Sequence, residues 1–276
     1  MLARRSAVAE TIARDGIEVD DDGDVRRFAV RVTTDAKAFA DRDAVIVAVK
    51  TYATADALAP LRAVLAPHAL VATVQNGLGN VEAVRDVLPG ARAIAGSTTQ
   101  GVVLLGHGRV RTVNRGTTTF ARDDTAAPTS AGLAAAFVGA GLDARVADDV
   151  ALLLWRKVVI VAAINPLGAL TGSTNGAVVS DPDLAPLART LALEAATVAR
   201  AEGADPGDPW TALEAAARAT AANRNSMLQD LDAGRPTEID AISGEILRRA
   251  RTHGIAVPLT ETMLRLVRAR EGNGFR

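Results

Sequence analysis

The chain has 276 residues, of which 49% are hydrophobic and 3% aromatic, so it can bury an aliphatic core in one large domain or two ordinary ones. Its formal net charge of −1, from 31 basic and 32 acidic residues, gives no overall field that would attract nucleic acid or an anionic membrane. Because the sequence contains no cysteine, disulfides, thiolate metal sites and cysteine nucleophiles are excluded. We expect no metal site and no nucleic-acid partner.

A membrane span needs roughly 18 consecutive apolar residues. The most apolar run, residues 158–164, is about a third of that length and ends at an Asn-Pro pair. We therefore expect a buried helix there and no membrane partner.

The first half of the chain alternates short apolar runs with helical stretches. Residues 44–49 (AVIVAV) and 69–74 lack polar alternation, which is typical of parallel strands covered on both faces. Such alternation predicts a doubly wound parallel sheet. The other elements expected here are an N-terminal surface helix ending at Gly16, helices at 53–65, after 76–80 and at 131–139, strands at 91–99 and 143–146, and an antiparallel meander at 102–120.

After about residue 148 the strand signal stops. The pattern predicts helices at 149–170, 184–202, 210–222, 226–232, 238–253 and 259–270. An α/β half followed by an all-α half indicates two domains, which we place at residues 1–147 and 148–276.

Two polar residues lie at the carboxyl ends of predicted parallel strands. Lys50 follows the strand at 44–49, and Asn76 follows the strand at 69–74. Ligands of open α/β sheets bind beyond the carboxyl ends of the strands, so both side chains are candidates for a binding crevice. The alternative is a solvated lysine and an ordinary Asn-Gly turn.

Lys157 lies on the long apolar helix predicted at 149–170. Lys157, Val161 and Asn165 are spaced four apart and so share one helix face about 12 Å long. A partly desolvated ammonium on such a face has a lowered pKa and gives up its proton more easily, which a guanidinium cannot do. Only three of the 31 basic residues are lysine, so this lysine is a candidate proton donor. The alternative is a lysine whose stem only covers the core.

A polar segment near residue 225 precedes another predicted helix. Thr237 is expected to cap the helix predicted at 238–253, with Glu238 in the first turn of that helix. Glutamate is common there because it interacts favourably with the helix dipole, so Glu238 alone does not indicate a site.

Together these residues resemble the ketopantoate reductase (2-dehydropantoate 2-reductase) family. The resemblance is carried in order along the chain by VAVKTY at Lys50, QNGLG at Asn76, LWRKVVIVAAINPLGALTG from Leu154, NSMLQDLDAGRPTEID from Asn225 and RRARTHGIAVP from Arg248. It implies a Rossmann-type NADP-binding domain followed by a helical substrate domain like that of 6-phosphogluconate dehydrogenase.

The resemblance also implies an activity. Members reduce the ketone of 2-dehydropantoate to (R)-pantoate with NADPH, in pantothenate and coenzyme A synthesis. A cytoplasmic enzyme acting on a small 2-oxo acid is therefore expected, with a homodimer left open.

Residue roles follow from the resemblance position by position. Lys157 matches the general acid that protonates the ketone oxygen. The matching substrate-binding positions are Lys157, Asn165, Asn175, Asn223, Asn225 and Ser226. The matching cofactor-side positions are Arg4, at the 2′-phosphate, Lys50, Asn76, Val102, near the nicotinamide, and Glu238, at the cofactor–substrate junction.

The sequence departs from the family at two places. Val161 stands where members often carry an asparagine that reaches the substrate. The sequence also contains no G-x-G-x-x-G, and Met1 falls near the end of the family's second strand, so the first strand and helix are expected to be missing.

These departures leave alternatives open. A start site assigned too far downstream accounts for the missing βα unit. A reductase of another branched 2-oxo acid is a second reading, and an inactive truncated relative that acts as an oligomerising module is a third.

Overall fold

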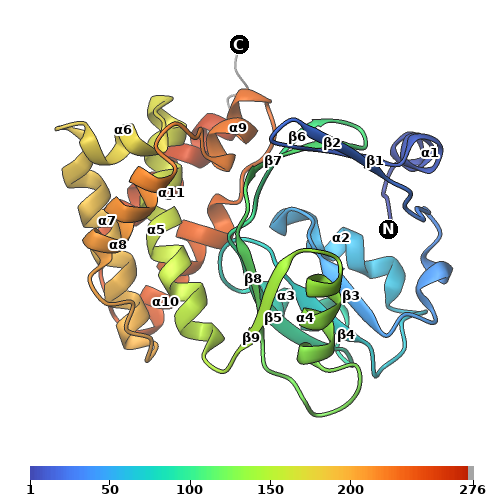
Figure 1. Cartoon of the computed structure of the whole chain (residues 1–276). Coiled ribbons are helices and arrows are strands. Elements are labelled where there is room, and N and C mark those ends of the chain that lie inside the picture. Colours follow the sequence, from blue (N-terminus) through green and yellow to red (C-terminus); the bar gives the residue numbers. More distant parts are fainter. Residues whose placement is uncertain (273–276) are drawn as a thin grey trace. The chain divides into compact units, whose positions relative to one another are not determined.

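The structure is a computed structural model that describes residues 1–272. Its contacts divide the chain into two compact units. The sheet unit comprises Met1–Gln75 and Asn80–Val150, and the helical unit comprises Asn76–Gly79 and the chain from Ala151 onward (Figure 1). The helical unit therefore includes a four-residue loop taken from the first half of the sequence.

A five-stranded sheet forms the centre of the sheet unit, in the order β3-β4-β5-β8-β9. Its strands are β3 (Ala44–Val47), β4 (Leu70–Thr73), β5 (Arg92–Thr98), β8 (Thr117–Ala121) and β9 (Asp143–Ala147). Strands β3, β4 and β5 are parallel, β8 runs antiparallel to β5, and β9 is parallel to β8. Within the described residues, β3 lies at one edge of this sheet.

Helices cover both faces of this sheet, as the uninterrupted apolar runs predict. Val71 packs into a core with residues of α2 (Thr54–Leu58) and α3 (Asn80–Val87), whereas its neighbours Leu70 and Ala72 pack with Leu133 of α4 (Ser130–Gly139). All four residues of β4 are buried. The helices of this unit are α1 (Ser6–Asp15), α2 (Thr54–Leu58), α3 (Asn80–Val87) and α4 (Ser130–Gly139), with 3₁₀ turns at Ala36–Phe39, Thr51–Ala53 and Ala59–Leu61.

A second, four-stranded sheet was not predicted as such. Its order is β2-β1-β7-β6, built from β1 (Ile17–Asp21), β2 (Asp24–Phe28), β6 (Gly101–Gly106) and β7 (Arg109–Asn114). The meander predicted at 102–120 is therefore divided: β6 and β7 pair in this sheet, whereas β8 pairs with β5 in the other. The N-terminal helix does end at Gly16, which has φ +73°.

Helices make up the helical unit, so the predicted α/β half followed by an all-α half is confirmed. Helix α6 was not predicted, and the start of the helix expected at 238–253 is a π-helical turn, η4. The elements are α5 (Val150–Thr171), α6 (Asn175–Ser180), α7 (Leu184–Ala201), α8 (Pro209–Ala219), α9 (Ser226–Asp232), η4 (Asp240–Gly244), α10 (Glu245–Thr252) and α11 (Pro258–Gly272).

Small side chains allow these helices to pack closely. Ala188, Ala192, Ala195, Ala196 and Ala199 of α7 are all fully buried. Alanine at these positions lets neighbouring backbones approach, which explains how a chain with few aromatic residues still forms a dense core.

Helix α5 is long and apolar enough, by length and composition, to cross a membrane. The apolar run at 158–164 is only part of this helix, which extends over 22 residues and continues through Pro166. Half of its most apolar window is buried inside the protein. The core helix of a folded unit meets the same criteria, so this feature is weak support for a membrane span.

Candidate active site

Lys157 lies on α5 beside the buried side chains of Val158 and Val159. Burial lowers the pKa of its ammonium from 10.5 to about 8, and the nearby negative charge of Glu238 opposes this shift. Desolvation penalises the charged form of a lysine, so this group is ready to release a proton near neutral pH. The structure therefore brings together Lys157 and Glu238, which the sequence could not connect.

Glu238 is 6% exposed. Its Oε2 accepts a hydrogen bond of 3.1 Å from the Nδ2 of Asn76. Thr237 Oγ1 accepts from the backbone N–H of Ile239 at 3.2 Å, just ahead of η4. Asn76, Glu238 and Lys157 form one polar group within the helical unit.

The loop Asn76–Gly79, called here the NGLG loop, is fixed by backbone contacts to η4. The N–H of Leu78 donates to the carbonyl of Ala241 at 2.9 Å, and the Leu78 side chain is buried in the core of the helical unit. Gly77 has φ +82°, and a Cβ there would lie 2.2 Å from the same carbonyl oxygen. Only glycine fits this approach, so Gly77 holds Asn76 in place against Glu238.

The role of Gly77 and Ala241 was missed by the sequence analysis. An Asn-Gly pair after a strand reads as a simple turn, and the run EIDAISGEIL reads as an ordinary helix. π-Helical turns occur frequently at functional sites, but they have no clear sequence signature.

Asn165, one of the predicted substrate residues on α5, is 7% exposed, while Val161 on the same helix is half-buried. Asn225 is also buried, but both ends of its side chain are used within the protein. Its Oδ1 accepts from the N–H of Leu228 at 3.0 Å, which caps α9, and its Nδ2 donates to the carbonyl of Ile164 at 3.4 Å. The structure thus gives Asn225 a positioning role, and its contact with substrate stays a prediction.

Gly168 makes room for Asn225. A Cβ on Gly168 would lie 2.4 Å from the Nδ2 of Asn225. No local sequence pattern indicates this close approach between α5 and the start of α9.

Asn175 and Asn223 are brought together by the backbone. The N–H of Asn175 donates to the carbonyl of Asn223 at 2.9 Å, and its Nδ2 donates to Thr220 Oγ1 at 3.0 Å. The Oδ1 of Asn175 is buried and has no hydrogen-bond partner among the described residues. Ser226 is exposed at the first position of α9. A buried acceptor without a donor is costly, so the position suits a ligand or a water that donates a hydrogen bond.

The remaining predicted site residues belong to the sheet unit. Lys50 is half-buried at the start of the 3₁₀ turn after β3, Val102 is 54% exposed on β6, and Arg4 is exposed before α1. Their cofactor roles stay predictions. Among residues 1–272, no group of three or more His, Cys, Asp or Glu residues is placed to hold a metal ion.

Descriptions of one known family match both parts of the chain. The family description "Ketopantoate reductase PanE/ApbA" matches residues 1–124, and "Ketopantoate reductase PanE/ApbA C terminal" matches residues 149–271. The chain belongs to the ketopantoate reductase family. The resemblance stated from the sequence is thereby confirmed, and with it the assignment as an oxidoreductase.

Individual relatives of this ketopantoate reductase family member agree. The 2-dehydropantoate 2-reductase of Halobacterium salinarum is 36% identical over 278 residues, covering 99% of this chain and 91% of the relative. That of Archaeoglobus fulgidus is 34% identical, covering 84% and 77%. The crystal structure of a PanE/ApbA family ketopantoate reductase from Ralstonia eutropha has a TM-score of 0.89 at 30% identity, covering 98% of this chain and 89% of the other.

The fold is shared more widely than the sequence. D-Mandelate dehydrogenase, solved with NADH and anilino(oxo)acetate, has a TM-score of 0.88 at 22% identity. At that identity the likeness concerns the fold alone.

Proposed function

We propose that this protein is a cytoplasmic 2-dehydropantoate 2-reductase that reduces the ketone of 2-dehydropantoate to (R)-pantoate with NADPH in pantothenate synthesis. The observation that carries the proposal is a half-buried lysine, with a pKa of about 8, next to a buried carboxylate in a member of this family. In this proposal the residues assigned to the cofactor are Arg4, Lys50 and Val102 of the sheet unit with Asn76 and Glu238 of the helical unit, and the residues assigned to the substrate belong to the helical unit.

The residues present fit a phosphorylated nicotinamide cofactor in part. Arg4 and Lys50 are cations suited to phosphate groups, and the amide of Asn76 with the carboxylate of Glu238 offers both donor and acceptor to a polar ring or ribose. The family's glycine-rich phosphate loop does not occur in this sequence. We therefore assign to these residues only the cation and amide contacts, with Val102 on the cofactor side.

The chemistry needs one hydride and one proton. When bound, NADPH supplies the hydride to the carbonyl carbon of the substrate. The ammonium of Lys157 donates its proton to the carbonyl oxygen, which becomes the hydroxyl of the product. Glu238 favours the protonated form of Lys157, and Asn76 holds the carboxylate of Glu238 in position. Asn165, Asn175, Asn223, Asn225 and Ser226 are assigned to the substrate.

Substitution of Lys157 tests the proposal. We expect Lys157→Ala to lower kcat by about 10²- to 10⁴-fold, the usual contribution of a general acid. Lys157→Arg keeps the charge but cannot release a proton in the accessible pH range, so it should be equally impaired. The measurement is the oxidation of NADPH in the presence of 2-dehydropantoate, and near-normal kcat in either variant would contradict the assignment.

A second candidate is the reduction of another branched 2-oxo acid. It is favoured by Val161, which lies one helical turn from Lys157 and offers no hydrogen bond to a substrate hydroxyl. Comparison of kcat/KM for 2-dehydropantoate with that for simple 2-oxo acids, each with NADPH and with NADH, separates the two. Absence of oxidation with every acid would favour the oligomerising module.

A further inference from the structure

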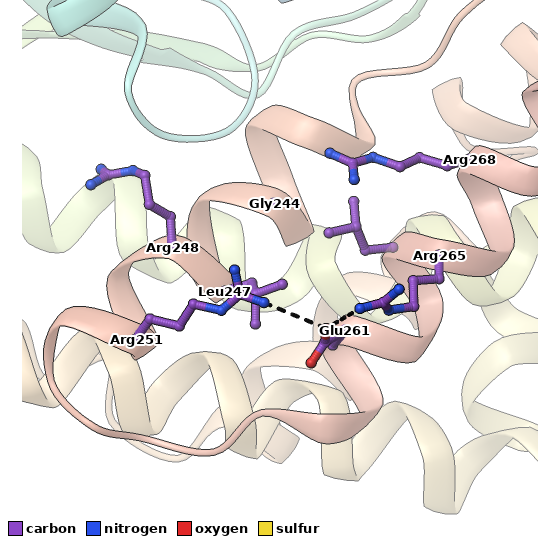
Figure 2. A pocket seen from close by; sticks show the side chains of 8 residues that line it. Gly244, Leu247, Arg248, Arg251, Glu261, Arg265 and Arg268 are labelled. Carbon is purple, nitrogen blue, oxygen red and sulfur yellow. Dashed lines mark hydrogen bonds and ion pairs between the residues drawn. The ribbon is translucent and has the colours of Figure 1, made fainter.

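Helices α10 and α11 line a pocket of about 470 Å³ within the helical unit (Figure 2). Four arginines contribute to its lining, two from each helix and spaced three apart: Arg248 and Arg251 on α10, and Arg265 and Arg268 on α11. Among the described residues, Glu261 is the one carboxylate of the lining. The lining therefore carries four positive charges and one negative charge, whereas the 31 basic and 32 acidic residues of the whole chain nearly balance.

Apolar residues complete the pocket. Leu264 is buried and Leu247 is half-buried, and both belong to the lining. Gly244, the last residue of η4, has no side chain to fill the space, and a Cβ there would meet nothing closer than 3.6 Å. The pocket volume falls within the range typical of small-molecule sites, roughly 300–1,000 Å³.

Glu261 is shared between the two helices. Its Oε1 accepts from Arg265 at 2.7 Å and lies 3.5 Å from the Nη2 of Arg251, as the dashed lines of Figure 2 mark. A guanidinium has five N–H donors, so one carboxylate cannot occupy the donors of two arginines. The pair Arg251 and Arg265 retains donors for a further anion.

Arg248 and Arg268 have acidic partners outside the pocket lining. Arg248 pairs with Glu245 at 2.8 Å, and the Nε of Arg268 donates to Asp240 at 2.8 Å. The side chains of all four arginines are more than half exposed. The ion pair of Arg268 with Asp240 is exposed on both sides and contributes little stability, so an incoming anion with several charges competes with it at low cost.

We propose that this pocket binds a small molecule carrying a chain of two or more phosphate groups, either inorganic pyrophosphate or a nucleoside diphosphate. The planar fork of arginine matches phosphate oxygens in a bidentate manner. Paired arginines on two facing helices suit a ligand with two adjacent anionic groups, whereas a single carboxylate would engage one arginine. This site is separate from the residues assigned to the reductase.

Calorimetric titration of the purified protein with inorganic pyrophosphate tests the proposal. We expect saturable binding that is weakened at least about tenfold in the double variant Arg251→Gln/Arg265→Gln, because two charge-assisted contacts are lost. Arg218→Gln is the matched control, because Arg218 forms the same i,i+4 pair with Glu214 on α8. Unchanged affinity in the double variant, or equal weakening in the control, would overturn the proposal.

Glu261→Gln should strengthen the binding of pyrophosphate rather than weaken it. It removes the carboxylate that competes with the ligand for Arg251 and Arg265, so affinity for pyrophosphate should rise severalfold. If the cluster were only a structural ion-pair network, this variant would gain no affinity, and that result would overturn the proposal.

Titration with ADP and with adenosine distinguishes a nucleotide ligand from a free phosphate chain. Tighter binding of ADP than of pyrophosphate, lost in the double variant, indicates a nucleotide. Equal binding of the two indicates the phosphate chain itself. Adenosine should not bind detectably, and binding of adenosine that the double variant retains would overturn the proposal.

Discussion

Lys157 carries an ammonium on an apolar helix face, and its environment determines its protonation. Burial lowers its pKa to about 8, while Glu238 acts in the opposite direction. A general acid works best when its pKa lies near the operating pH, and this lysine meets that condition without a metal ligand or a cysteine. Arginine predominates elsewhere among the cations of this chain, so lysine here fits a proton-transfer role.

The pH dependence of the proposed reaction follows from this pKa. Lys157 must be protonated to donate, so kcat/KM should be constant below about pH 8 and fall about tenfold for each pH unit above it. Glu238→Gln removes the charge that raises the pKa of Lys157, so the decline should begin at a lower pH. The measurement is kcat/KM across the pH range.

Asp240→Asn is the control for that experiment. Asp240 lies two residues from Glu238 but is exposed and paired with Arg268, so this substitution should leave the decline in place. A decline that stays at the same pH in Glu238→Gln would contradict the coupling between Glu238 and Lys157.

At the scale of single residues, the sequence indicated which side chains are candidates for a site, but not which of them lie close together. Lys157 was singled out by its apolar helix face and Thr237 by its place ahead of a predicted helix, both of which are local signals. The contact between Glu238 and Asn76 depends on tertiary packing between distant segments, and no spacing rule contains it. The role of Asn225 was ambiguous for another reason: an asparagine that caps a helix and one that binds a ligand look alike in sequence.

At the scale of elements, patterns that reflect burial were predictable. The run at 69–74 is apolar at successive positions and forms β4, which is buried on both faces. Strand β2 is exposed at every position, so it has no apolar alternation to detect. A signal was nevertheless present in the pair Asp22-Gly23, which has φ values of +56° and +88° and is typical of a tight hairpin turn.

The junction between the NGLG loop and η4 gives a prediction at this scale. Gly77→Ala places a Cβ against the carbonyl of Ala241, so the loop must shift and Asn76 must move away from Glu238. We expect kcat/KM to fall by at least about tenfold, since small misplacements of a site residue are costly. The reductase assay and urea unfolding measure the two effects.

Gly203→Ala is a matched control for Gly77→Ala. Gly203 also has φ +82°, but a Cβ there would meet nothing within 4 Å. Both variants should lose about 1–2 kcal/mol of stability from the left-handed backbone conformation, with a further loss in Gly77→Ala from the displaced loop, while activity should fall only in Gly77→Ala. Equal activity in the two variants would contradict a positioning role for Gly77.

At the scale of the whole molecule, the sequence placed the division of the chain at residues 147–148, whereas the contacts place it between Val150 and Ala151. The larger difference is that the helical unit is discontinuous in sequence. Residues 76–79 carry the pattern of a turn within the first half, and nothing local indicates that Leu78 is buried among helices formed by the second half.

Leu78 should therefore stabilise the helical unit. We expect Leu78→Ala to lower the free energy of unfolding by about 2–5 kcal/mol, the usual cost of a cavity left by a buried leucine. Leu266→Ala is the control, because that side chain is 47% exposed and its removal should change stability by about 0.5 kcal/mol or less. Similar losses in both variants would contradict the burial of Leu78, and urea unfolding measures them.

The discontinuous helical unit also has a consequence for biosynthesis. Domains generally fold as units, N-terminal first, while the chain leaves the ribosome. Leu78 is translated well before any helix of the unit that buries it, and Ala241, whose carbonyl receives its N–H, is translated near the end. The backbone hydrogen bond that holds Leu78 can therefore form only after nearly the whole chain has emerged. The second half, made alone, lacks residues 76–79 of its native unit.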